Sequence, residues 1–145
     1  MSRVDFAHGA RHRLRMACRT TARHVQAGHR MAVWCTDARR LQRYDTLLWS
    51  FDPVSFIPHV HAQDPLVDHA PVVLVDQPAD LRALSACGWL LNLDLACPPH
   101  AARFARILEI VSEHPDDRAA ARQRWQQYRK QGLELHSHAL PTGAD

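Results

Sequence analysis

The chain has 145 residues, a hydrophobic fraction of 46% and a net charge of +3 at pH 7 with histidine neutral. This length predicts one domain spanning residues 1–145, and the hydrophobic fraction excludes wholesale disorder. No apolar run approaches the roughly 20 residues of a membrane span, and the amino terminus lacks the apolar stretch of a secretory signal. The mild positive charge permits an acidic partner but is too small to indicate a nucleic-acid-binding protein. We therefore expect a cytoplasmic protein without membrane contact.

Cysteine and histidine spacings give no sign of a metal. The four cysteines form no C-x-x-C pair, so reduced and buried thiols are expected. His59 with His61, and His136 with His138, would each place two imidazoles on one side of a strand. Neither pair has a thiolate or carboxylate at a recognised ligand spacing, and there is no H-E-x-x-H. We expect no metal and no other cofactor.

The first third of the chain predicts alternating strands and helices. Residues 4–6 suit a short strand that ends at His8 and Gly9, and residues 14–25 have the apolar spacing of an amphipathic helix that Gly28 ends. The apolar run 31–35 suits a strand buried on both faces. Thr36 or Asp37 can cap a helix over residues 38–50. The first helix would carry arginines on its outer face: Arg13, Arg15, Arg19 and Arg23.

Residues 49–59 are an aromatic connection punctuated by prolines. Connections are normally polar, so this one is either a hydrophobic lid on the core or a docking surface for another protein. Phe56 is the better candidate for an exposed contact. Trp49 has core packing as its alternative, because it lies on the same side of the preceding helix as Leu41, Tyr44 and Leu48.

The remaining elements continue the alternation. Residues 60–70 are polar and rich in turn formers, and the apolar runs 71–76 and 89–93 predict two more strands around a short helical segment in 77–88. A helix is expected over 97–104, with 107–111 either a fifth strand or its continuation. Pro115 opens a helix to Gln131, which Gly132 ends. Residues 133–136 suit a closing strand, and we expect 139–145 to be a flexible tail.

Near-continuous apolar strands between helices predict the α/β class, with a three-layer α/β/α arrangement and a largely parallel central sheet. The five glycines form neither G-x-G-x-x-G nor a P-loop, so the domain is nucleotide-fold-like without a phosphate-binding motif. Cys35 follows a strand but has no evident partner base, which favours a core cysteine. No catalytic residue is predicted. A small nucleotide- or small-molecule-binding enzyme on this fold is the alternative.

The last helix offers a surface with an arginine stripe. Arg118, Arg122, Trp125 and Arg129 stand at i, i+4, i+7 and i+11 and so share one side, whereas Ala121 and Tyr128 face the core. Guanidiniums around an indole fit an acidic peptide that ends in an apolar residue. The stripe could also follow a nucleic-acid backbone with a stacked base. A solvated face with a half-buried tryptophan is the third alternative.

Four features over nearly the whole chain carry a family resemblance. They are the first strand with its Ala- and Cys-containing helix, the block from Leu47-Leu48-Trp49 to Ser55-Phe56-Ile57-Pro58-His59, the run Leu90-Leu91-Asn92-Leu93, and Arg122-x-Arg124-Trp125-x-x-Tyr128-Arg129-x-x-Gly132. The second and fourth, in this order and separation, are specific. The sequence resembles the chi subunits of bacterial DNA polymerase III, which are accessory proteins of the clamp loader.

The resemblance implies a non-catalytic adaptor in DNA replication that is a monomer when free. Chi subunits bind the acidic, Phe-ending tail of the single-stranded-DNA-binding protein and the psi subunit, so DNA is reached through a partner. By position, the tail site includes Val111, Arg122 and Trp125, and Gln126 stands where well-known members have a lysine. Either Arg118 or Arg129 would supply the missing cation, or the affinity for the tail would be lower. The psi or other clamp-loader contact would use the aromatic block: Trp49, Phe51, Phe56 and Ile57.

Overall fold

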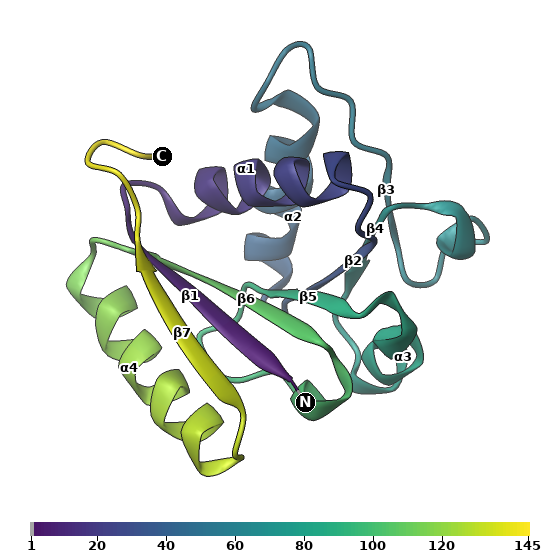
Figure 1. The fold of residues 1–145 in the computed structure, drawn as a ribbon. Coiled ribbons are helices and arrows are strands. Elements are labelled where there is room, and N and C mark those ends of the chain that lie inside the picture. The colour runs from purple at the N-terminus through teal and green to yellow at the C-terminus, as the bar shows by residue number, and fades with distance from the viewer. Residues whose placement is uncertain (1) are drawn as a thin grey trace.

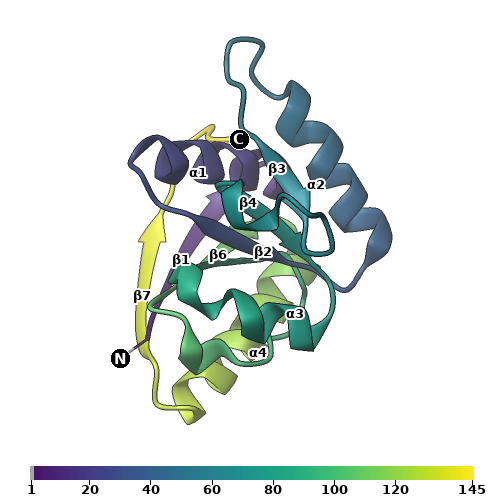
Figure 2. The ribbon, with the colours of Figure 1, turned by 90° about the vertical axis from the view of Figure 1, so that its right-hand side faces the viewer.

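The computed structural model describes residues 2–145, in which seven strands form one parallel sheet between two layers of helices (Figures 1 and 2). The strand order is β3-β4-β2-β5-β6-β1-β7. The α/β class and the three-layer arrangement predicted from the sequence are confirmed. The strands are β1 (Arg3–Ala10), β2 (Met31–Trp34), β3 (His59–His61), β4 (Val72–Val75), β5 (Trp89–Asn92), β6 (Arg106–Ser112) and β7 (Glu134–Ala139). The helices are α1 (Arg13–Gln26), α2 (Ala38–Ser50), α3 (Pro78–Ala83) and α4 (Pro115–Lys130).

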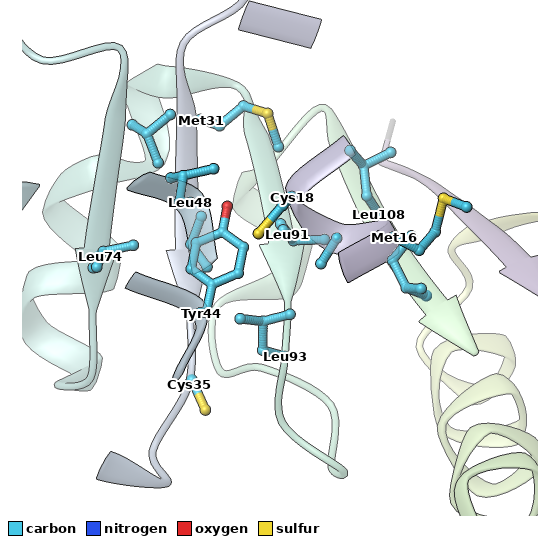
Figure 3. Close-up of a cluster of buried hydrophobic side chains, with 14 of the residues drawn as sticks. Met16, Cys18, Met31, Cys35, Tyr44, Leu48, Leu74, Leu91, Leu93 and Leu108 are labelled. Atoms are coloured by element: carbon cyan, nitrogen blue, oxygen red, sulfur yellow. The ribbon is translucent and has the colours of Figure 1, made fainter. Parts of the chain in front are cut away.

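The order of the strands decides which helices share a face. The chain runs from β1 through β2 to β3 in one direction across the sheet, and later from β4 through β5 and β6 to β7 in the other. Right-handed crossovers then place α1 and α2 on one face and α3 and α4 on the other. Tyr44 of α2 lies at the centre of the first face (Figure 3), where its hydroxyl meets Thr21 Oγ1 of α1 at 2.6 Å. Each face therefore has its own apolar core.

Local signals set the ends of the two long helices that were predicted. The Asp37 carboxylate accepts the Arg40 amide at 3.0 Å and so caps α2. Pro115 occupies the first turn of α4, and two acids follow it, as the helix dipole favours. Gly132 has φ +78°, which lets the chain leave α4 and enter β7.

Three elements differ from the sequence-based expectation. β1 extends to Ala10, and β3 adds a short edge strand within the region expected to be polar turns. The helix expected over 97–104 is wrong, because only a 3₁₀ turn at Ala101–Arg103 forms. Pro98 and Pro99 lack the amide donors that a helix needs and push the preceding residue out of helical conformation. Residues 107–111 belong to β6 and do not continue a helix.

Arg13 does not lie on the outer face of α1 as predicted. Its guanidinium reaches over the carboxyl end of the sheet, where Nε donates to Ile110 O at 2.9 Å and Nη1 donates to Leu93 O at 2.7 Å. Leu93 and Ile110 come directly after Asn92 and Glu109, the last residues paired between β5 and β6, and burying their carbonyls without a partner would be costly. Arg13 therefore closes the edge of the sheet.

The last residues fold back along α1, although residues 139–145 were expected to be a flexible tail. Ala139 is the final residue of β7, and the Leu140 amide donates to His8 O at 2.8 Å. The Arg11 amide donates to Ala144 O at 3.1 Å, and the Asp145 carboxylate pairs with Arg19 at 2.5 Å. This segment thus begins within a strand and is hydrogen bonded to the rest of the chain.

A buried ion pair joins α4 to the sheet. Arg124 and Glu109 are 1% and 0% exposed, and Arg124 Nε donates to Glu109 Oε1 at 3.1 Å. Glu109 Oε2 accepts from the Tyr128 hydroxyl at 2.6 Å and from Asn92 Nδ2 at 2.8 Å. Arg124 Nη1 also donates to Leu95 O at 3.0 Å. The pair fixes both the position of α4 on the sheet and its rotation about its axis.

Removing one partner of this pair should destabilise the fold strongly. Arg124→Met leaves the Glu109 carboxylate buried and without its cation, which should cost about 3–5 kcal/mol of unfolding free energy. The double variant Glu109→Leu with Arg124→Met removes both charges and should recover a large part of that loss. Urea unfolding measures both. Arg122→Met, an exposed change on the same helix, is the control and should stay within about 0.5 kcal/mol of the parent. A double variant no more stable than Arg124→Met alone would contradict the coupling.

Candidate peptide-binding site

A cavity of about 420 Å³ opens between α4 and strands β6, β1 and β7. Two kinds of side chain line it. Apolar groups from the sheet and from α4 form its interior, and arginines from α4 stand at its rim. The lining residues are Phe6, His8, Val111, Arg118, Ala121, Arg122, Trp125, Gln126 and Ser137. We call this cavity the α4 pocket.

Aromatic packing shapes the interior of the α4 pocket. The Phe6 ring lies 5.3 Å from the Trp125 ring and 6.0 Å from the Tyr128 ring, measured between centroids. Tyr128 and Val111 are buried, whereas Trp125 is half-buried. The indole therefore has one part packed on the sheet and another part available to a ligand, as amphipathic aromatics at binding sites commonly do.

The arginines at the rim are free to bind an anion. Arg118 and Arg122 are exposed, and neither forms an ion pair with any of residues 2–145. A guanidinium presents a planar fork of donors that matches a carboxylate. An apolar hollow with unpaired guanidiniums at its edge can hold an apolar side chain and a carboxylate together.

The rotation of α4 follows from which of its side chains the sheet buries. Ala121, Arg124 and Tyr128 face the sheet, so Arg118, Arg122 and Trp125 point along the neighbouring side toward the pocket. At the start of the helix, the Asp117 carboxylate accepts the Ser112 amide at 2.7 Å and ties the first turn to the end of β6. The arginines are thus presented by a helix whose first turn is tied to the sheet.

The structure brings together four of the five residues predicted for the tail site. Val111, Arg118, Arg122 and Trp125 line one pocket, but Arg129 is exposed and lies outside the lining. The sequence analysis missed the β1 side of the pocket, Phe6 and His8, and also Ser137 of β7. The period-two alternation of β1 places Phe6 and His8 on one face, but only the parallel pairing of β1 with β6 places that face under α4.

The aromatic block divides into buried and exposed parts. Ile57 is 4% exposed and lies in the core, so its prediction as a partner contact is corrected, and Phe51 packs half-buried against the same core. Trp49 is 49% exposed and Phe56 72% exposed, with their rings 5.4 Å apart. Inward side chains anchor this connection, while Trp49 and Phe56 form an exposed apolar pair that we call the aromatic patch.

A buried histidine supports the aromatic patch. His59 Nε2 lies 2.7 Å from Asp45 Oδ1 and its Nδ1 lies 2.8 Å from Ile57 O. The Trp49 ring packs on this imidazole at 4.2 Å between centroids. His59 is thereby held by hydrogen bonds in the core and orients Trp49. Within residues 2–145, no group of three or more His, Cys, Asp or Glu side chains is arranged to hold a metal ion.

The crevice where this fold usually binds nucleotides is occupied by protein. It lies between the carboxyl ends of β2 and β5, whose outgoing connections leave on opposite faces. The Asp94 carboxylate accepts from the Thr36 amide and from Thr36 Oγ1, both at 2.8 Å, and Arg40 Nη1 lies 3.8 Å from Asp94 Oδ1, so these side chains span the gap between the two strand ends. Burial raises the pKa of the nearby Cys35 thiol to about 11, which keeps it protonated and unreactive at neutral pH.

The fold and its surfaces define a class of protein. It is a parallel α/β domain in which side chains fill the usual nucleotide crevice, and its two accessible sites, the α4 pocket and the aromatic patch, suit contacts with other proteins. A sequence model of the family described as "DNA polymerase III chi subunit, HolC" matches residues 1–136, and the chain belongs to this family. The chi subunit of Pseudomonas aeruginosa is 34% identical over 97% of this chain and 99% of its own. Those of Escherichia coli K12 and Haemophilus influenzae are each 26% identical, over 84% and 83% of this chain and 82% of their own.

Membership of this family places the chain among the accessory proteins of DNA replication. Among residues 2–145, no helix has the length and apolar character needed to cross a membrane.

Nucleotides should not stabilise the folded protein, because the Asp94 carboxylate occupies the crevice. Thermal-shift measurements with millimolar ATP, GTP and NAD at matched ionic strength should leave the melting temperature unchanged. A ligand that binds only the native state raises the melting temperature. A concentration-dependent rise with any of these nucleotides would revive the enzyme alternative.

Proposed function

We propose that this chain is a non-catalytic adaptor of the DNA polymerase III holoenzyme. One surface, the α4 pocket, takes the acidic C-terminal tail of the single-stranded-DNA-binding protein. A second, the aromatic patch, contacts the clamp loader, through a psi subunit where one exists. The protein acts in the cytoplasm, is a monomer when free, and reaches DNA through its partner.

The α4 pocket is the observation that carries this proposal. Its 420 Å³ are enough for an aromatic side chain, and Phe6, Val111 and Trp125 give it an apolar interior. Arg118 and Arg122 stand beside that interior without acidic partners of their own among residues 2–145. A peptide that ends in phenylalanine offers the matching ligand, since its ring and its terminal carboxylate are on the same residue.

Charge and disorder set the expected strength of binding. A short acidic tail is disordered when free and loses conformational entropy when it binds. Gln126 lines the pocket without a charge, so the guanidiniums carry the attraction. We expect a dissociation constant on the order of micromolar, and weaker binding as added salt screens the exposed charges.

Substitutions along α4 test whether peptide affinity depends on the residues that line the α4 pocket or on any exposed arginine of the helix. With a fluorescently labelled acidic peptide ending in phenylalanine, Arg122→Ala and Trp125→Ala should each weaken binding by about tenfold or more. Arg129→Ala is the matched control, because Arg129 is exposed on α4 but lies outside the pocket lining, and it should change affinity by less than about twofold. Fluorescence anisotropy measures all three. Equal losses in Arg122→Ala and Arg129→Ala would point to general charge attraction and against the pocket.

The aromatic patch supports the second contact. Its apolar surface is formed by Trp49, Phe56 and the neighbouring Val54, which is 90% exposed. Removing this surface from water would contribute favourable free energy to binding a partner. The inward anchors Phe51 and Ile57 hold the loop in place, so the patch is preorganised, which lowers the entropic cost of binding.

Changing the aromatic patch should remove the clamp-loader contact and spare the tail. The double variant Trp49→Ala with Phe56→Ser should no longer retain clamp-loader subunits in a pull-down from native lysate, and it should bind the acidic peptide as the parent does. Leu66→Ser is the control, since Leu66 is 61% exposed on a different loop. Retention of clamp-loader subunits by the double variant would remove the patch from the proposal.

A further inference from the structure

A second, smaller cavity lies on the opposite face of the same three strands, β6, β1 and β7. It encloses about 160 Å³ between α1 and strands β6, β1 and β7. Five basic side chains from these four elements line it: Arg3, Arg23, His24, Arg106 and His138. Glu109 also borders it, but its carboxylate is hydrogen bonded to Arg124 and Tyr128 of α4 on the other face. We call this cavity the α1 cavity.

One carboxylate faces these five bases. Asp5 accepts from Arg3 Nε at 3.0 Å, from Arg106 Nη1 at 3.1 Å and from His138 Nε2 at 3.3 Å. Arg23 and His24 have no side-chain hydrogen bond to any of residues 2–145. Asp5 therefore neutralises only part of the positive charge, and donors remain unused on three arginines.

Arg106 is held in place for a ligand. Its guanidinium carbon lies 5.0 Å from the centroid of the Trp89 ring, a cation–π contact, while the His29 ring stacks on Trp89 at 4.2 Å. Together with the Asp5 hydrogen bond, this leaves Arg106 one orientation, with Nη2 and Nε free of a protein acceptor among residues 2–145.

His24 lies among these positive charges. The pKa of its imidazole is lowered to about 4, mainly by burial and in smaller part by the charges of Arg23, His29 and Arg106, with Asp5 acting in the opposite direction. The same field that disfavours a proton on His24 favours an anion beside it.

We propose that the α1 cavity binds a phosphate group, with Arg23 and Arg106 as its main ligands and Arg3 and His24 beside them. Arginine forks suit the tetrahedral oxygens of phosphate, and the volume admits one such group. The phosphate can belong to a free phosphate or to the backbone of a single DNA strand. The site lies across the sheet from the α4 pocket and shares no lining residue with it, so it goes beyond the adaptor role.

Histidine NMR titration tests the site directly. Inorganic phosphate at tens of millimolar, compared with sodium chloride at equal ionic strength, should raise the His24 titration midpoint by about one pH unit, because a nearby anion stabilises the imidazolium. Arg23→Gln should abolish most of this rise, and Arg23 is exposed, so the fold is kept. Arg19→Gln is the control on the same helix and should leave the rise intact. No rise in the parent, or an equal rise in Arg23→Gln, would overturn the site.

Two further variants test the assignment in opposite directions. Arg106→Gln should weaken phosphate binding by about tenfold or more. Asp5→Asn removes the resident carboxylate and should strengthen it severalfold, an outcome that a purely structural charge cluster does not predict. If both variants weaken binding equally, the proposal fails.

Two comparisons complete the test. One identifies the source of the phosphate, and the other distinguishes the α1 cavity from the α4 pocket. An oligothymidylate of about 15 nucleotides that moves the His24 midpoint, and that free phosphate displaces, identifies the DNA backbone. A response to free phosphate alone identifies a small ligand. The acidic peptide should bind Arg23→Gln normally, and phosphate should bind Arg122→Ala normally. Failure of the phosphate site is thereby distinguishable from failure of the tail site, and no response to either phosphate source overturns the inference.

Discussion

The buried pair of Arg124 and Glu109 is the interaction on which the arrangement of α4 depends. Complete burial raises the pKa of Glu109, while the Arg124 charge and the hydrogen bonds from Asn92 and Tyr128 favour the ionised form. Two charges taken out of water gain little net stability, but they tolerate only one geometry. Because Glu109 has its acceptors filled from β5 and α4, the helix cannot slide or rotate without leaving a carboxylate unpaired. The α4 pocket is therefore defined by a constraint located beneath it.

At the carboxyl edge of the sheet, side chains fill the crevice in which other α/β domains bind nucleotides. Asp94 and Thr36 bond to each other across the gap between β2 and β5, and Arg13 closes the neighbouring strand ends. These side chains form hydrogen bonds at the strand ends where other domains of this architecture bind a nucleotide. The architecture is therefore kept without its usual ligand. Two cavities then lie where helices leave the sheet partly uncovered, along β1 and the edge strand β7.

The sequence predicted what depends on local pattern and missed what depends on pairing across the chain. The bounds of α2, the capping by Asp37 and the buried side of α4 follow from spacing and were found. The share of Phe6 in the α4 pocket depends on the parallel pairing of β1 with β6, about a hundred residues away in the chain, and no local signal carries it. Arg13 was expected on the outer face of α1 because its residue type favours exposure, and no local pattern marked Arg124 as buried. Only the position of unpaired carbonyls and of Glu109 explains their burial.

The placement of the surfaces bears on how an adaptor works. Figure 2 shows α2 and α4 on opposite faces of the sheet. The α4 pocket is lined by α4, whereas the aromatic patch consists of Trp49 in the last turn of α2 and Phe56 in the loop that follows. Between them stand β2 and β5, whose residues are almost all buried and which Asp94 and Thr36 join at their carboxyl ends. Coupling between sites requires an element whose equilibrium both ligands bias. Under the proposed adaptor role, a sheet that keeps this one arrangement lets each partner bind with its own affinity, and the two surfaces then connect the partners by proximity. Such a connection gains from effective concentration, and modest affinities at each surface suffice.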